Sequence, residues 1–97
     1  MIRGTTPVIK FTLPEEIEFN VLYITFRQGE ENILEKTLED VVVDGATIYL
    51  KLTQAETLAF DRTSMVWVQI RGRAGETAYA SKIMRVSISD ILKGGEI

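Results

Sequence analysis

The sequence contains no cysteine and no histidine among its 97 residues. Without cysteine the chain forms no disulfide, offers no thiolate to a metal ion and has no cysteine nucleophile. Histidine is the usual general base, the usual partner of a serine nucleophile and the commonest metal ligand, so its absence removes serine-histidine hydrolysis and histidine-zinc chemistry. We therefore expect a protein that is not an enzyme, with no catalytic residue, no cofactor and no metal site.

Long hydrophobic runs and an excess of basic charge are also missing. No apolar stretch approaches the roughly 18 residues that span a bilayer, and the first ten residues lack the apolar region of a signal peptide. The 11 basic and 14 acidic side chains give a net charge of −3, whereas a nucleic-acid binder needs clustered lysine and arginine. We therefore expect no membrane partner, no nucleic-acid partner, and a location inside the cell or within an assembled particle.

What the sequence does contain is a series of short stretches in which apolar and polar residues alternate. The length suits one domain over residues 1–97, and 45% hydrophobic with 26% charged residues is typical of a globular protein. Seven such strands with one short helix predict an all-β fold, an immunoglobulin-like β-sandwich, and a small closed or half-closed barrel is the alternative. The predicted strands cover residues 8–13, 21–28, 33–38, 39–43, 47–52, 64–74 and 77–89.

Local signals within these strands predict edges, turns and a bulge. Pro7 at the start of the first strand favours an edge position. The pair Asp44-Gly45 between two apolar stretches is a strong signal for a two-residue hairpin turn. In the last predicted strand the alternation changes phase near Ser81, which indicates a bulge or bend there.

Two segments carry signals for a helix, and the N-terminal segment carries signals for neither a helix nor a strand. Thr53 followed three residues later by Glu56 is a capping box, which predicts a short helix over residues 53–60 that crosses from one sheet to the other. Residues 89–95 suit one helical turn, with a serine cap and terminal glycines. Residues 1–5 are small and polar, and we expect them to fray or to form an arm.

The strand from Ser64 to Ala74 has two faces of different character. Val66, Val68 and Ile70 form an apolar row that belongs to a core, while the opposite row contains the only tryptophan of the chain. If this strand and strand 21–28 share a sheet, its outer surface has the aromatic and methionine content of an interface core. The candidate interaction face comprises Tyr23, Thr25, Met65, Trp67 and Gln69. The competing interpretation is that the short helix or the C-terminal turn covers Trp67.

An acidic cluster of Glu39, Asp40 and Asp44 could supply oxygen ligands to Ca²⁺, which takes about six to eight of them. The spacing matches no EF-hand loop, and loops carry charge at little cost, so a solvated turn is favoured.

The segment Arg71-Gly72-Arg73 places two arginines on the same face of a strand, where they could bind an anion. The net negative charge and the nearby Glu76 favour a hairpin with cross-strand ion pairs instead.

Two further functions stay open on the residues alone. Trp67 and Tyr23 could stack on sugar rings, as in a small carbohydrate- or ligand-binding module. An enzyme that uses acids alone would need two carboxylates at hydrolytic spacing, and no pattern among the fourteen acids selects a pair.

Six segments, in order and over nearly the full length, carry a likeness to a known family. They are the opening MIRGTTPVIKF.LP, LYITFRQ followed by LEKTL, KLTQAETLAF, VQIR, the AS.I sequence and the closing ILKGGEI. On these segments the chain resembles small proteins encoded in phages and prophages of low-GC Gram-positive bacteria, near their tail and baseplate genes. Similar proteins often have an Asp-Gly hairpin where this chain has residues 73–76. The resemblance implies a non-catalytic tail or baseplate component or assembly factor. Its partners would be phage structural proteins or further copies of itself, in the bacterial cytoplasm or in the virion.

Overall fold

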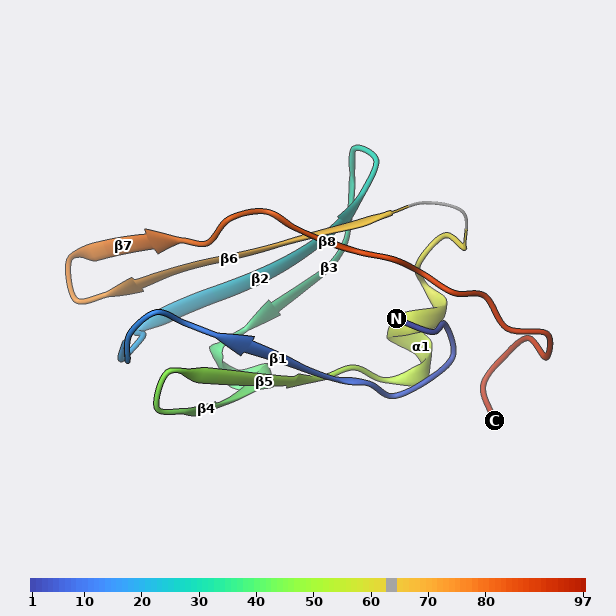
Figure 1. Ribbon diagram of the computed structural model, residues 1–97, viewed down its shortest axis with the longest axis horizontal. Helices are drawn as coiled ribbons and strands as arrows, with labels where there is room; N and C mark the ends of the chain where they lie inside the picture. The colour runs from blue at the N-terminus through green and yellow to red at the C-terminus, as the bar shows by residue number, and fades with distance from the viewer. Residues whose placement is uncertain (63–64) are drawn as a thin grey trace.

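The computed structural model describes residues 1–62 and 65–97 and contains two antiparallel sheets packed as a sandwich (Figure 1). One sheet has three strands in the order β1-β5-β4, and the other has the order β3-β2-β6-β7, with β8 also paired to β6. The elements are β1 (Val8–Thr12), β2 (Val21–Gln28), β3 (Glu31–Thr37), the 3-10 turn η1 (Leu38–Asp40), β4 (Val41–Asp44), β5 (Thr47–Lys51), α1 (Gln54–Leu58), β6 (Val66–Ala74), β7 (Thr77–Ala80) and β8 (Met84–Val86).

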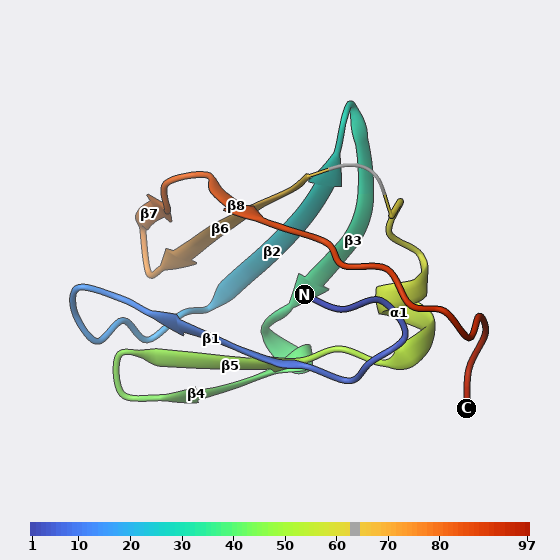
Figure 2. The same ribbon diagram turned by 45° about the vertical axis from the view of Figure 1, so that its right-hand side comes forward.

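The strand order is that of an immunoglobulin-like sandwich. Strands β1, β5 and β4 take the positions of strands B, E and D, while β3, β2, β6 and β7 take those of C′, C, F and G. In the described ranges each strand pairs only within its own sheet, so the predicted sandwich is confirmed and the barrel is not formed (Figure 2). Among the described residues no strand takes the place of strand A beside β1, so β1 is an edge strand, as its proline predicts.

Three hairpins in this sandwich close through two-residue loops that begin with glycine. Gly29, Gly45 and Gly75 have φ angles of 59°, 59° and 60°, in the left-handed region that glycine adopts without steric cost. The second loop is Gly45-Ala46, because Asp44 still pairs with Thr47, so the turn lies one residue later than predicted.

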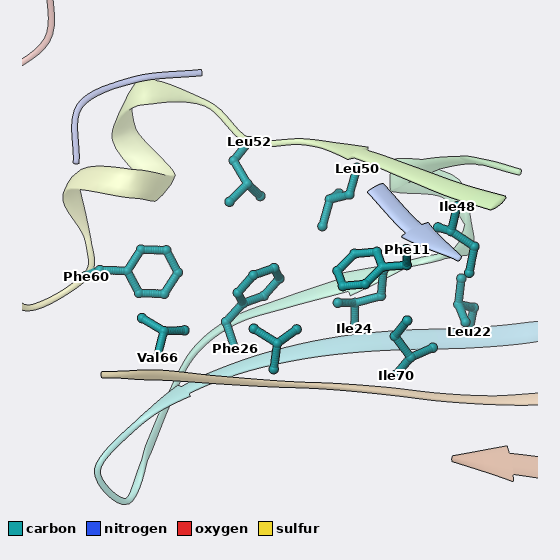
Figure 3. Packing of buried hydrophobic residues seen from close by; sticks show 11 residues of the cluster. Phe11, Leu22, Ile24, Phe26, Ile48, Leu50, Leu52, Phe60, Val66 and Ile70 are labelled. Atoms are coloured by element: carbon teal, nitrogen blue, oxygen red, sulfur yellow. The ribbon is translucent and has the colours of Figure 1, made fainter. Parts of the chain in front are cut away.

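The core lies between the two sheets and combines the apolar rows of both (Figure 3). The inward row of β6 is buried as predicted, with exposed fractions of 0–4%. Phe26 and Phe60 contact each other with ring centroids 5.9 Å apart, and burying an aromatic or aliphatic side chain contributes about 1.5–3 kcal/mol. The core residues are Phe11, Leu22, Ile24, Phe26, Ile48, Leu50, Leu52, Phe60, Val66, Val68 and Ile70.

The predicted phase change near Ser81 is confirmed as a break between β7 and β8. Both strands pair with β6, but the register advances by one residue between them. Ser81 fills the break, because its backbone N–H donates to the Ile70 carbonyl at 2.8 Å and its Oγ accepts from the Ile70 N–H at 2.9 Å. Met84 and Val86 then turn toward the core.

The helix α1 closes one end of the sandwich and connects β5 of one sheet to β6 of the other, as predicted (Figure 1). Thr53 Oγ1 accepts from the Glu56 N–H at 3.2 Å, and Glu56 Oε1 accepts from the Thr53 N–H at 2.9 Å, so the capping box forms. No helix of the described chain has the length and apolarity needed to cross a bilayer.

The N-terminal residues are docked, so the prediction of a frayed arm is wrong. Arg3 donates to the carbonyls of Leu58 and Phe60 at the end of α1, which have no partner within the helix. The Met1 carbonyl accepts from the N–H of Ser89, and the Ser89 carbonyl accepts from Arg3. Residues 89–95 do not form the predicted helical turn, and Ser89 pairs with the N-terminal residues instead.

Candidate functional site

The candidate interaction face is the outer surface of strands β2 and β6, which are direct neighbours in the five-stranded sheet. Thr25 lies opposite Gln69, and Trp67 lies opposite Arg27. Tyr23 shares this surface and is 44% exposed. The structure therefore brings these predicted residues of β2 and β6 together.

Met65, the fifth residue of the predicted face, directly precedes β6 and is 42% exposed. The sequence interpretation began this strand at residue 64, which lies outside the described residues.

Trp67 is not covered by the helix. The neighbouring residues Val66 and Val68 point into the core, so Trp67 points to the opposite side of the sheet, whereas α1 lies between the two sheets at one end (Figure 1). The indole is 39% exposed, and the Arg85 guanidinium lies over it at 5.6 Å from the ring centroid. Such a cation–π contact holds the Arg85 side chain in place, and the indole still keeps part of its surface exposed to solvent.

Four arginines share this outer surface, and none of them belonged to the interaction face predicted around Trp67. Arg71 and Arg73 alternate with the inward residues of β6, so their spacing in the sequence already indicated a common face. Arg27 and Arg85 flank Trp67 from β2 and β8, and only the strand register reveals this.

These arginines are free of ion pairs in the described part of the chain, where the pairs are Arg3–Asp90, Arg62–Asp90 and Lys36–Glu56. The predicted cross-strand ion pair with Glu76 is therefore not formed. The reason is that Arg71 and Arg73 lie opposite alanines of β7, whereas Glu76 lies in the hairpin loop.

Two shallow hollows mark the basic face. One of about 250 Å³ lies around Trp67, Arg27 and Ile83, and another of about 300 Å³ lies between Tyr23 and the two arginines of β6. Gln69 is held by a hydrogen bond from its Nε2 to the Ser81 carbonyl at 3.0 Å. The surface is thus preformed and partly rigid, which lowers the entropy cost of binding.

The acidic cluster of Glu39, Asp40 and Asp44 is split between η1 and β4. Asp40 Oδ2 accepts from the Thr37 N–H at 2.8 Å, and this hydrogen bond lowers the pKa of the Asp40 carboxyl against the smaller effect of its burial. Asp40 therefore serves as a cap for η1. Within residues 1–62 and 65–97, no group of three or more acidic side chains is arranged to hold a metal ion.

A cleft of about 540 Å³ lies between β1 and β7, where a strand A would lie in a complete sandwich. Its walls are apolar and include Phe11, Phe19 and Met84. Among the described lining residues Glu15 is the one carboxylate, whereas hydrolysis by acids alone uses two.

Comparisons with known proteins add no relative: no family model, no curated protein and no solved structure matches this chain.

Proposed function

We propose that this chain is a non-enzymatic structural or assembly protein that acts through protein–protein contacts, as a component of a phage or prophage tail or baseplate. The contact surface is the outer face of β2 and β6. The tail or baseplate role rests on the resemblance of six sequence segments to proteins encoded near such genes.

The observation that carries the proposal is the uncovered Trp67 with arginine around it. Tryptophan, tyrosine and arginine are the residues that most often dominate binding energy at protein interfaces. On this face Trp67 is 39% exposed, Tyr23 is 44% exposed and four arginines have no acidic partner in the described chain. A solvated sheet face would normally carry mixed polar residues instead.

The proposal is tested by co-expressing the chain with the products of its neighbouring genes and measuring co-purification. We expect at least one product to co-purify, and Trp67→Ala to reduce its recovery about tenfold or more, as for an interface hot spot. Val42→Ala is the matched control, because Val42 is also an exposed strand residue, at 65%, but lies in the other sheet.

Recovery that is equal for the two variants would contradict the role of this face. Purified particles that contain no copy of the chain by mass spectrometry would contradict a structural role in the particle, while a role as an assembly factor would still require co-purification.

A carbohydrate- or ligand-binding module is the second candidate, favoured by the exposure of Trp67 and Tyr23 on one face. The Arg85 guanidinium over the indole counts against it, since a sugar needs the bare ring. Binding on a glycan array that Trp67→Ala abolishes would favour this candidate, and silence on a broad array would count against it.

A further inference from the structure

The charge of this chain is divided unevenly between two surfaces. We define the basic face as the outer surface of β3, β2, β6 and β8, in which β3 is the neighbour of β2. This face carries four arginines and one glutamate, a net charge of +3. Because the whole chain has a net charge of −3, the remaining surface carries −6. The charged residues of the basic face are Arg27, Glu35, Arg71, Arg73 and Arg85.

The opposite charge is concentrated in an acidic end formed by residues 14–20 and 38–46. These two segments contain six carboxylates and no lysine or arginine. They are the loop after β1 and the segment from η1 through β4 to the β4–β5 hairpin. The loop after β1 and the hairpin loop project at the same end of the sandwich (Figures 1 and 2), and Leu38 of η1 lines one hollow with residues of both. The carboxylates belong to Glu15, Glu16, Glu18, Glu39, Asp40 and Asp44.

The two segments of the acidic end meet around an apolar centre. A hollow of about 270 Å³ is lined by Ile17 and Val43 together with Glu16 and Glu18. The acidic end thus combines carboxylates with exposed apolar surface, and the basic face combines arginines with exposed aromatic rings. The two surfaces are therefore complementary, since their charges are opposite and both expose apolar groups.

We propose that the acidic end of one copy docks on the basic face of the next, so that the chain self-associates head to tail. This proposal rests on the proposed function of the basic face as a protein-docking surface and names a second copy as its partner. Arginine and carboxylate form bidentate, charge-assisted hydrogen bonds, and the indole of Trp67 would pack on the apolar centre around Ile17.

Charge also selects the geometry of the association. A two-fold dimer that used the basic face on both sides would place four arginines against four arginines, which is repulsive. A head-to-tail contact pairs unlike surfaces and leaves one free surface of each kind. Such contacts close into rings or extend into filaments, depending on the rotation between copies.

The experiment is sedimentation of the full chain at about 0.02 M and 0.5 M salt, which changes the screening length several-fold. We expect the wild-type mass to exceed the monomer mass of 10.9 kDa at low salt and to return to it at high salt. The double variant R71E/R73E reverses two charges of the basic face, and E16K/E18K reverses two of the acidic end. Each should weaken self-association about tenfold or more, and an equimolar mixture should form a complex of two chains that contains one of each.

Two matched controls carry the same charge changes elsewhere. K10E/K51E alters the outer face of the other sheet, and E30K/E31K alters the β2–β3 hairpin. Both should self-associate within about twofold of a chain with unchanged surfaces, after correction for net charge by salt titration.

The mixing experiment also reports folding, since two misfolded variants would not restore a defined complex. A wild-type chain that stays monomeric at low salt would overturn head-to-tail association, while Trp67-dependent co-purification of a neighbouring gene product would leave the proposed function standing. Association that survives both reversals, fails to recover on mixing, or is lost equally in the controls would also overturn it.

Discussion

The two faces of β6 differ in what each residue contacts, although they alternate along one strand. Val66 and Val68 on the inner face are 0% and 2% exposed, whereas Trp67 between them is 39% exposed. The inner face packs in the core between the two sheets, whereas on the outer face the Arg85 guanidinium lies over Trp67 and Gln69 donates to the Ser81 carbonyl. A two-layer sandwich buries one face of each sheet, so an apolar residue on the other face needs a different explanation.

Stability and binding capacity therefore belong to different faces of this domain. Inner-face residues should determine the free energy of unfolding, and outer-face residues should determine association. The four predictions below test this separation, in order of decreasing effect.

The largest effect is expected from Phe26→Ala on the inner face of β2. Phe26 is fully buried and contacts the Phe60 ring, so its truncation should lower the free energy of unfolding by about 3–5 kcal/mol. Urea unfolding followed by circular dichroism measures this loss. The control is Tyr23→Ala on the outer face of the same strand, for which we expect less than about 1 kcal/mol. Similar losses for both variants would contradict the assignment of stability to the inner face.

Gly72→Ala should cause the next largest loss in the free energy of unfolding. A methyl group here would lie 2.5 Å from the Phe19 ring and 2.9 Å from the Val21 carbonyl oxygen, and the backbone oxygen has little freedom to move. We expect a loss of about 1–3 kcal/mol in the same unfolding assay, because the inner face is filled even where β6 has no side chain. Gly94→Ala is the control, since nothing lies within 4 Å of that position. A neutral Gly72→Ala would show that the Phe19 ring is loosely packed.

The third prediction concerns a charge on the inner side of the sandwich. Lys36 lies opposite the buried Ile24 and forms an ion pair with Glu56. Burial raises the pKa of the Glu56 carboxyl, but the hydrogen bonds from Lys36 and from the Thr53 backbone outweigh it, so the net pKa is lowered.

Because the pKa of Glu56 is lower in the folded chain, its carboxylate stabilises the fold fully at pH values above the pKa in the unfolded chain, about 4.3. This stabilisation is lost as the pH falls through the pKa in the folded chain. We expect a loss of about 1 kcal/mol between neutral and acid pH, reduced by solvent screening. Glu56→Gln should flatten this pH dependence in unfolding experiments. An unaltered profile for Glu56→Gln would contradict the assignment.

The smallest effect on stability is expected from Trp67→Ala. The substitution removes an exposed cation–π contact, so the free energy of unfolding should fall by less than about 1 kcal/mol. Thermal unfolding of Trp67→Ala beside Val66→Ala provides the measurement, because these adjacent residues lie on opposite faces of one strand. A loss for Trp67→Ala that matches that of Val66→Ala would mean that the outer face is structural rather than a docking surface.

Much of the fold could be predicted because its signals are local. Two-residue alternation identified the inner rows, and the Asp44-Gly45 pair located the β4–β5 turn to within one residue. The capping box of Thr53 and Glu56 located α1, although the helix ends at Leu58 rather than residue 60. These features depend on backbone conformation and on nearest neighbours, which the sequence specifies directly.

The candidate site could be predicted only in part. Tyr23, Thr25, Trp67 and Gln69 were placed on one face from alternation and from the assumption that two strands are neighbours, which the register bears out. Arg27 and Arg85 were missed, because their proximity to Trp67 depends on which residues of β2, β6 and β8 lie opposite each other. No pattern within a single strand contains that information.

The amino-acid pattern alone was enough to predict the all-β sandwich and the buried row of Val66, Val68 and Ile70, and it excluded cysteine and histidine chemistry. The docking of the N-terminal residues through Arg3, the position of α1 at an end of the sandwich, and the placing of Arg27 and Arg85 beside Trp67 became visible only in the folded chain. The physical reason is distance along the chain: these outcomes depend on contacts between segments far apart in sequence, and such contacts exist only once both sheets have packed.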